Sequence, residues 1–447
     1  MASSLSPDRT TALLEGLTRS NRREARRRPF ESGERQPIHT VYGGAHLFKA
    51  TTPRRLGDLA LAALAEHAPD ARTLADAVGL EGGASLAHAV YERVVEKLRR
   101  EPIEDYRIDF EDGFGVRPDS EEDGEAERAA RELARGLRDG TLPPFIGIRV
   151  KSLDEEQKAR ALRTLDLFVS TLLAETQGVL PPNFVVTLPK VASVAQVRSF
   201  ARMLGELEEA TGLAAGALRL ELMIELPQAL LDGKGRTVLP RLARAAGGRC
   251  VAVHFGTYDY TAACGVTALH QSPEHPACDL ARHLMQLAFA GTGIRISDGA
   301  TSVLPVPPHR GGSLSPEELA ENRAAVHAAF RAHYRHVRHA LVGGFHQGWD
   351  LHPGQLPIRY AASFAYFLEG LDTARARLVH FLDSAARATT VGTAFDDAAT
   401  GQGLLNTFLR AWSAGAIGED ELAQTGLTLD ELRTRSFRAI LEGRARR

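Results

Sequence analysis

Three carboxylates crowd the end of an apolar run in the stretch YRIDFEDGFG, residues 106–115. Asp109, Glu111 and Asp112 fall within four residues, and two glycines follow closely. A turn needs a single Asp or Asn, and neighbouring carboxylates repel one another unless a cation or hydrogen-bond donors offset their charge. The cluster therefore predicts a cation or several hydrogen-bond donors facing this point of the chain.

Two further carboxylates come directly after apolar runs. Glu225 ends LRLELMIE, and Asp259 lies in HFGTYDYTAACG, just past another such run. Taken singly, Glu225 fits a helix cap or a solvent-facing position, and Asp259 fits an Asx-turn. On adjacent strands, two hard carboxylates with room for water suit Mg²⁺ or Mn²⁺, which prefer oxygen ligands. We therefore expect the pair to form a metal site.

Basic side chains close two other apolar runs. Arg149 ends FIGIRV, where an unpaired buried guanidinium would be unfavourable. It therefore pairs with Glu111 or Asp112, grips a substrate carboxylate, or does both. Lys190, in TLPKV, has the same two interpretations. His352 precedes a proline in GGFHQGWDLHPGQL and fits either a structural role or a contact with substrate.

Short apolar runs alternate with longer stretches of helical period along the chain. The candidate strands are residues 39–44, 105–110, 145–150, 183–191, 218–225, 250–256, 294–297 and 340–345. The helical stretches between them include 121–138, 154–175, 192–212, 227–246, 276–290 and 315–337. This order predicts an α/β protein with a (β/α)₈ barrel. A doubly wound open sheet is the alternative, but the first strand is not followed by GxGxxG, and GxxxxGK[ST] does not occur.

The strand ends of such a barrel meet at one mouth, where chemistry is built. Gly43 and Gly44 end the first strand, so they join Lys190 and His352 as candidates for contacts with substrate near Arg149. We expect three parts in the chain: an N-terminal helical and basic extension at 1–35, the barrel at 36–360, and a C-terminal helical appendage at 361–447. His333, His336 and His339 lie at helical spacing among arginines, and we expect them on a solvated face.

The bulk composition is that of an ordinary soluble globular chain of 447 residues. With 54 basic and 56 acidic residues, a net charge of −2 leaves none of the basic excess typical of nucleic-acid binding. No apolar run approaches the ~18 residues that a membrane helix needs, and no signal-peptide core opens the chain. Three cysteines without CxxC spacing indicate neither a disulfide scaffold nor a zinc finger. We expect a cytoplasmic protein without a membrane or nucleic-acid partner.

With these residues in this order, the chain resembles the HpcH/HpaI aldolase and citrate lyase β-subunit superfamily, whose barrel malate synthases and pyruvate-domain enzymes share. The similar motifs are DFEDG, IRV, LPKV, MIELPQAL, FGTYDY and GGFHQGWDLHPGQL, in order between about residues 39 and 358. The sequence departs from the family pattern where Val-Lys-Ser follows Arg149 and where Leu226 replaces the Thr often found after the metal-binding Glu. The chain is also much longer than a typical citrate lyase β-like protein.

The resemblance implies an Mg²⁺-dependent barrel that makes or breaks C–C bonds beside a carbonyl through an enolate. It implies metal binding by Glu225 and Asp259 and substrate binding by Arg149. It places Glu111 and Asp112 beside the metal water or Arg149. In relatives that use acyl-CoA an acid from a C-terminal segment reaches the site, and Asp397, next to Asp396 in TAFDDAATG, is our candidate for it.

Four functions follow as hypotheses. The first is a metal-dependent lyase or aldolase acting on a 2-oxo acid or an acyl-CoA. The second is a malate synthase-like condensation of an acyl-CoA with a small oxo acid, and the third is an enzyme that uses phosphoenolpyruvate. The fourth is a barrel that only binds a ligand, which the presence of all the expected polar residues disfavours. Because relatives are commonly trimers or hexamers, we expect a homo-oligomer.

Overall fold

The computed structural model of the protein describes residues 6–27, 35–387 and 398–445. Its centre is a sheet of eight parallel strands in the order β7-β6-β5-β4-β3-β2-β1-β8. The strands are β1 His39–Gly44, β2 Asp105–Asp109, β3 Phe145–Arg149, β4 Phe184–Leu188, β5 Arg219–Ile224, β6 Cys250–Phe255, β7 Arg295–Ser297 and β8 Gly348–Asp350. A parallel bridge between Ala300, just after β7, and Trp349 of β8 joins the two edges. The sheet is thus a nearly closed (β/α)₈ barrel, as the sequence predicts.

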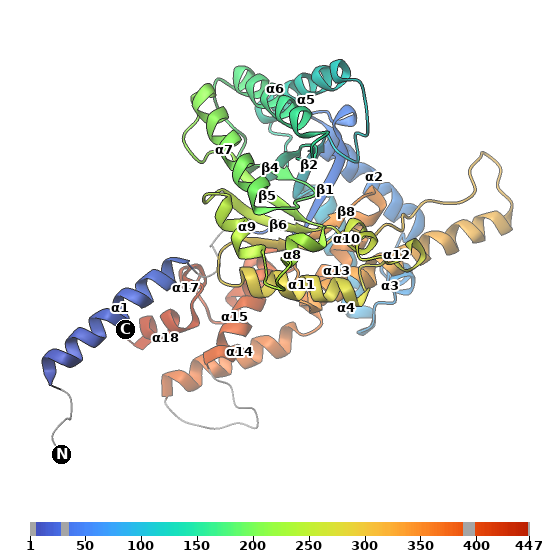
Figure 1. Cartoon of the computed structure of the whole chain (residues 1–447). Helices are drawn as coiled ribbons and strands as arrows, with labels where there is room; N and C mark the ends of the chain where they lie inside the picture. Colours follow the sequence, from blue (N-terminus) through green and yellow to red (C-terminus); the bar gives the residue numbers. More distant parts are fainter. Residues whose placement is uncertain (1–5, 28–34, 388–397, 446–447) are drawn as a thin grey trace.

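Helices surround this barrel (Figure 1). They are α2 Thr52–His67, α3 Ala71–Val78, α4 Gly83–Arg100, α5 Asp119–Asp139, α6 Lys158–Thr176, α7 Val194–Thr211, α8 Pro227–Leu230, α9 Leu239–Ala245, α10 Thr257–Ala263, α11 Pro276–Phe289, α12 Pro316–Val342 and α13 Leu356–Leu368. Strands β2, β3 and β4 are buried at every position, as expected of parallel strands covered by helices. Capping boxes at Ser193 and Ser315 fix the starts of α7 and α12.

Further helices lie outside the barrel at both ends of the chain. They are α1 Pro7–Arg27 before it and, after it, α14 Leu371–Arg387, α15 Ala398–Ser413, α16 Glu419–Ala423, α17 Leu429–Thr434 and α18 Phe437–Ala445. In Figure 1, α1 and the red C-terminal helices lie on the same side of the barrel. No helix of the described ranges is long and apolar enough to span a membrane.

The eighth strand is not where the sequence predicts it. Residues 340–345 form the end of α12 and a turn, because the helical pattern continues to Val342 and Gly344 then adopts φ +83°. The strand that pairs with β1 is the shorter β8 at Gly348–Asp350. The expected long helix at 227–246 is likewise two short helices, α8 and α9, separated by a turn whose bridge pairs Leu231 with Thr237.

Two of the three α12 histidines predicted on a solvated face are buried instead, while the His339 side chain is 37% exposed. His333 and His336 are buried, at 1% and 8% exposure, because this helix packs between α3 and α13. Nε2 of His333 lies 3.0 Å from Asp350 in β8, and Nδ1 of both His333 and His336 lies within 3.1 Å of the Thr301 hydroxyl. The prediction was wrong because hydrophobic periodicity does not reveal a buried polar network.

Candidate active site

The predicted site residues follow the C-terminal ends of consecutive strands, so they lie around one mouth of the barrel. The residues and elements are Gly43 and Gly44 in β1, Glu111 and Asp112 after β2, Arg149 at the end of β3, Lys190 after β4, Glu225 after β5, Asp259 in α10 after β6, and His352 after β8. Asp397 lies outside the described residues. The remaining residues divide into a charged cluster and a more apolar pocket.

Arg149 is held mainly by Asp109. Its Nε and Nη2 donate to the two carboxylate oxygens at 2.7 and 2.5 Å, and its Nη1 lies 3.0 Å from Oε2 of Glu111 and 3.7 Å from Asp112. Burial alone would raise the pKa of Asp109, but the guanidinium holds that pKa below its ordinary value. The Cζ atom of Arg149 lies over the Tyr42 ring, 4.8 Å from the ring centre. The arginine is thereby fixed in position, with one nitrogen toward the other acids.

The predicted pairing of Arg149 with Glu111 or Asp112 is found, but the spacing of the residues did not reveal Asp109 as its main partner. A signal for it exists in the sheet register, since Asp109 of β2 pairs directly with Arg149 of β3. Facing side chains of neighbouring strands are in contact distance. The choice among three nearby acids therefore depends on strand register, which spacing along the sequence does not give.

Lys190 binds the other two acids of the cluster. Its Nζ makes a close ion pair with Glu111 and lies 3.2 Å from Oδ1 of Asp112. Although burial opposes it, the charge of Glu111 raises the pKa of Lys190 above its ordinary value. The Lys190 backbone has φ +47°, which is unfavourable for a residue other than glycine, and its N–H donates to Oε1 of Glu225 at 2.5 Å. The residue thus links the acidic cluster to Glu225.

Glu225 is a buried carboxyl, 2% exposed, that forms no ion pair with another side chain in the described ranges and accepts a hydrogen bond from the Lys190 backbone. Burial first, and then the charges of Glu111 and Asp259, raise its pKa from 4.5 to about 8. A Cβ atom on Gly256 would lie 2.5 Å from Oε2 of Glu225, so the glycine leaves the space that this carboxylate occupies. Gly256 was not among the predicted site residues, although it stands in the same FGTYDY stretch as Asp259.

The fit of a divalent cation can be judged from these donors. Glu225 and Asp259 provide hard oxygen ligands, and their mutual repulsion is the kind that a cation relieves. Within the described ranges, groups of three or more His, Cys, Asp or Glu side chains in position to hold a metal are absent. Two carboxylates and several waters nevertheless suffice for Mg²⁺, which keeps part of its water shell. The residues present therefore fit Mg²⁺ or Mn²⁺.

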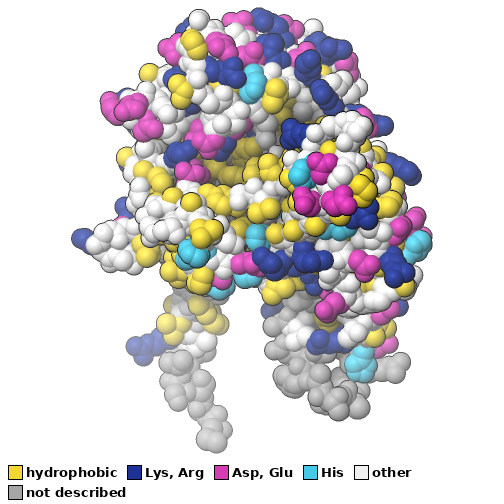
Figure 2. Space-filling view, turned by 90° about the vertical axis from the view of Figure 1, so that its right-hand side faces the viewer, with side chains coloured by type: hydrophobic (Ala, Val, Ile, Leu, Met, Phe, Trp, Pro, Cys, Tyr) yellow, Lys and Arg dark blue, Asp and Glu magenta, His cyan; other side chains and the backbone are white. Residues whose placement is uncertain are grey.

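A pocket of about 410 Å³ adjoins the end of β1. Its lining includes Gly43, Gly44, Tyr106 and His352, with leucines of α2. A Cβ on Gly43 would lie 2.0 Å from the Tyr106 hydroxyl, and one on Gly44 would lie 2.3 Å from a backbone carbonyl, so both positions exclude a side chain. Nδ1 of His352 accepts from the backbone N–H of Gly354 at 3.1 Å. In Figure 2, a hollow on the face toward the viewer has a largely hydrophobic floor with charged side chains beside it.

Below the mouth, the barrel interior contains a second set of charged side chains. Arg107 donates through Nη2 to Glu221 at 2.8 Å and through Nε to the Thr187 hydroxyl at 3.1 Å. Trp349 donates its indole N–H to Nδ1 of His254 at 3.0 Å. Because indole only donates, Nδ1 of His254 carries no proton, and the ring proton lies on Nε2, 3.0 Å from Glu221. The interior is a paired polar layer that the sequence analysis did not predict.

The chain belongs to a protein family described as a domain of unknown function (DUF6986), whose family model matches residues 17–440. No curated protein matches the sequence. Among solved structures, a citrate lyase from Burkholderia xenovorans LB400 is similar with a TM-score of 0.53 and 18% identity, over 78% of this chain and 94% of that one. A malate synthase from Haloferax volcanii with magnesium and glyoxylate has a TM-score of 0.44 and 16% identity, over 91% and 96% of the two chains. The expected resemblance to citrate lyases thus holds for the fold.

Proposed function

We propose that the chain is a divalent-metal-dependent enzyme that makes or breaks a carbon–carbon bond beside a carbonyl group. The reaction would pass through an enolate of a 2-oxo acid or an acyl-CoA. The observation that carries the proposal is Glu225, a carboxyl buried at the barrel mouth whose pKa is raised to about 8 beside two further acids. A carboxyl in this state is typical of a functional site. The proposal extends to this chain the lyase class of the citrate lyase that shares its fold.

Glu225 and Asp259 would hold Mg²⁺ or Mn²⁺. A cation bound there supplies polarisation of the substrate carbonyl and stabilisation of the negative charge that develops on its oxygen. The N–H of Lys190 keeps one Glu225 oxygen in place, and Gly256 leaves room for the other. These contacts position Glu225, and Asp259 would join it from α10, which follows the neighbouring strand β6.

Arg149 would bind the carboxylate or carbonyl oxygen of the substrate. Since Asp109 fixes its Nε and Nη2, the guanidinium needs little reorganisation when charge develops near Nη1. Glu111 lies between Arg149 and Lys190, and burial raises its pKa above the ordinary value. Such a carboxyl is suited to hold or move a proton. The pocket beside Gly43, Gly44 and His352 offers space for the rest of the substrate.

Proton exchange tests the enolate. The protein is incubated in D₂O with Mg²⁺ and, in separate tubes, pyruvate and acetyl-CoA, and proton NMR follows loss of each methyl signal. We expect exchange that requires Mg²⁺ and is lost in Glu225→Gln but kept in Glu127→Gln, an exposed α5 position paired with Arg131. The donor that exchanges identifies the substrate class.

A second tube set adds a small oxo acid to acetyl-CoA. Consumption of both would indicate condensation rather than cleavage as the reaction of this site. If neither donor exchanges, with or without the second substrate, the enolate proposal is wrong.

A further inference from the structure

The pocket of about 410 Å³ beside the mouth lies between β1, helix α2 and the short 3₁₀ turn η3 (Pro353–Gln355) that follows β8. Its lining shares Gly43, Gly44 and His352 with the predicted site. Most of the remaining lining is apolar and includes Leu47, Leu56, Leu59, Leu351, Pro353 and Leu356. The pocket is therefore an apolar extension of the barrel mouth.

Three of these leucines are open to solvent. The exposed fractions of Leu47, Leu59 and Leu351 are 65%, 45% and 43%. Single exposed leucines are common on protein surfaces, whereas a contiguous apolar group marks a place where something binds. These three come from separate segments, after β1, in α2 and after β8, and they meet at one pocket. Contact with an apolar ligand would remove their side chains from water, which is favourable.

The pocket contains little charge. Among its lining residues, all of which are in the described ranges, Arg55 is the one Lys, Arg, Asp or Glu, and its side chain is exposed on α2. Nδ1 of His352 accepts from the Gly354 N–H, and burial lowers the pKa of His352 below its ordinary value, so the ring is neutral at physiological pH. A ligand with several negative charges would meet one guanidinium here, whereas an apolar chain would meet leucines from three segments.

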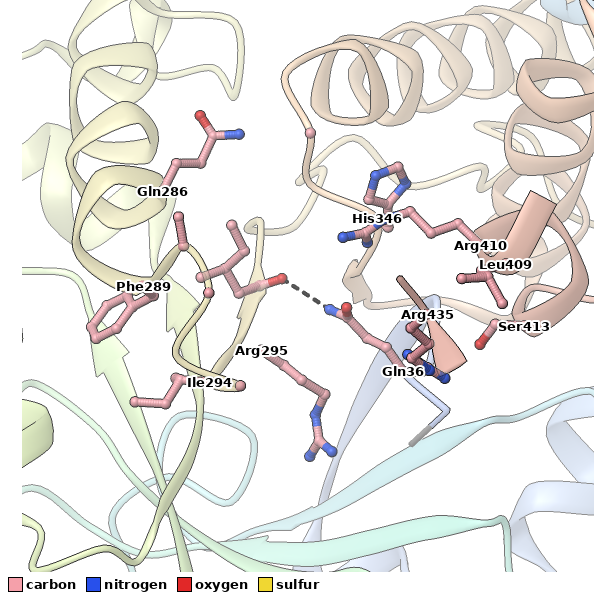
Figure 3. A pocket seen from close by; sticks show the side chains of 15 residues that line it. Gln36, Gln286, Phe289, Ile294, Arg295, His346, Leu409, Arg410, Ser413 and Arg435 are labelled. Carbon is pink, nitrogen blue, oxygen red and sulfur yellow. Dashed lines mark hydrogen bonds between the residues drawn. The ribbon is translucent and has the colours of Figure 1, made fainter. Parts of the chain in front are cut away.

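A cavity at the opposite end of the barrel shows the contrast (Figure 3). It has a volume of about 270 Å³ and lies between residues near the starts of β1, β7 and β8 and the C-terminal helices. Its lining contains Arg295, Arg410 and Arg435, and Gln36 donates to the Ile296 carbonyl at 3.2 Å, the dashed line in Figure 3. An apolar chain there would remove polar groups from water, which is unfavourable. The pocket at the mouth is the better place for an apolar group.

The pocket adjoins the charged cluster of the mouth. The Tyr42 ring belongs to the pocket lining and lies under Cζ of Arg149, 4.8 Å from it at the ring centre. A Cβ atom on Gly44 would lie 2.3 Å from the carbonyl oxygen of Gly113, which directly follows Asp112. A substrate whose carboxylate or carbonyl oxygen is bound by Arg149 can therefore extend its remaining atoms into this pocket.

We propose that this pocket binds an apolar chain of the substrate, so that the enzyme prefers substrates with an alkyl chain of several carbons to pyruvate or acetyl-CoA. The inference rests on the proposed function, since it assigns a substrate class to that same site. The chain belongs either to a 2-oxo acid or to the acyl group of a thioester, which have the same apolar chemistry. The pocket volume lies in the lower part of the ~300–1,000 Å³ range of small-molecule sites, which suits a chain of modest length.

Isothermal titration calorimetry of the full chain with Mg²⁺ tests this preference in two ligand series. One series contains pyruvate, 2-oxobutanoate, 2-oxohexanoate and 2-oxooctanoate, and the other contains acetyl-, butanoyl- and octanoyl-CoA. In one of the series we expect affinity to rise about fourfold for each methylene that enters the pocket. The series that shows this gain identifies which substrate carries the chain.

Leu47→Gln and Leu59→Gln each place an amide in the pocket lining at a position largely open to solvent. Each should weaken binding of the longest ligand of that series on the order of fivefold more than binding of the shortest. Leu287→Gln is the matched control, because Leu287 lies on α11, outside the pocket lining, and is 76% exposed. This control should keep the full gain per methylene.

Three calorimetric results would overturn the proposal: no binding in either series, equal affinities along both series, or a gain per methylene that Leu47→Gln and Leu59→Gln both keep. Equal weakening of acetyl-CoA and octanoyl-CoA in the two variants would also overturn it, because the pantetheine arm would then occupy the pocket. Circular dichroism checks that each variant is folded, and if one leucine variant does not fold, the other carries the test.

Size-exclusion chromatography tests a competing occupant, a second copy of this chain. Altered elution of the leucine variants together with an unchanged gain per methylene would show that a second copy covers these leucines, and would exclude the substrate chain. The deuterium exchange experiment judges the reaction separately. Exchange without a gain per methylene would retain the proposed function and exclude this pocket, and a gain without exchange would do the reverse.

Discussion

Two glutamates of the same strand region lie four residues apart and have opposite environments. Glu221, inside the barrel, and Glu225, at its mouth, are both buried, at 1% and 2% exposure. Burial by itself raises the pKa of both. Arg107 and His254 nevertheless hold the pKa of Glu221 well below its ordinary value, whereas the pKa of Glu225 rises to about 8.

The difference lies in the neighbouring charges rather than in burial. In the barrel interior, Glu221 has Arg107, His254 and the Thr187 hydroxyl as partners, so its negative charge is compensated. At the mouth, Arg149 forms an ion pair with Asp109 and Lys190 forms one with Glu111. Glu225 lies near the like charges of Glu111 and Asp259. A buried carboxyl without a cation as partner indicates function more strongly than a buried carboxylate in an ion pair.

The largest effect should come from breaking the interior pair. Glu221→Ala removes a partner of the buried Arg107 guanidinium, and we expect a loss of about 3–5 kcal/mol of stability, measured as the shift in urea unfolding. Glu127→Ala is the control, because its pair with Arg131 is exposed and should contribute less than about 1 kcal/mol. Equal losses in the two variants would show that the interior layer does not stabilise the barrel.

The next prediction concerns how the stability of the fold depends on pH when divalent cations are absent. The folded chain keeps the Glu225 proton up to pH about 8, while the unfolded chain loses it near 4.5. The unfolded state thus binds fewer protons in this interval, and stability should fall as pH rises through it, by on the order of a few kcal/mol. Glu221 acts in the opposite sense, since its stabilisation is lost as pH falls below 4.5.

Urea unfolding in EDTA across this interval measures the slope. The Glu225→Gln variant lacks the titrating group, so its stability should fall less than that of the wild type as pH rises. Parallel curves for the two proteins would mean that Glu225 does not have a raised pKa in the folded state.

The third prediction concerns metal affinity at the mouth. Glu225→Gln and Asp259→Asn should each weaken Mg²⁺ binding, followed by calorimetry, at least about 10–100-fold, since even outer-shell changes at metal sites have effects of this size. Glu221→Gln removes a charge from the interior layer instead and should leave Mg²⁺ affinity unchanged wherever the variant folds. Unchanged Mg²⁺ affinity in both mouth variants would exclude this pair as the metal site.

The smallest expected change in stability concerns two buried threonines, Thr187 and Thr257. The Thr187 hydroxyl donates to Glu221 at 2.7 Å and accepts from Arg107, so Thr187→Val should cost about 1.5 kcal/mol. The hydroxyl of Thr257, at the mouth, is buried without a hydrogen-bond partner in the described part of the chain, and Thr257→Val should cost nothing or stabilise. Urea midpoints of both variants measure the difference, and a larger loss at Thr257 would contradict the comparison.

The local sequence determined the barrel and its mouth. Seven of the expected strands coincide with observed ones to within a few residues, because apolar runs between helical stretches are a local property of the chain. The polar residue at each strand end reaches the mouth for the same reason, since parallel strands place their C-terminal ends together. The prediction of the eighth strand at 340–345 was wrong because β8 has only three residues. Helix α12 continues into the expected position as far as Val342.

Only the tertiary structure decided which charges are partners. The predicted pairing of Arg149 with Glu111 or Asp112 is confirmed for both acids through Nη1. Strand register adds Asp109 as the partner that binds Nε and Nη2, and three acids within four residues do not reveal that arrangement. Arg295 and Arg410, more than a hundred positions apart in the chain, line one cavity. Pairing energies depend on distance and burial in space, whereas periodicity reports only which face of an element is apolar. The sequence therefore predicts where charged residues gather, and the folded structure determines which of them are compensated.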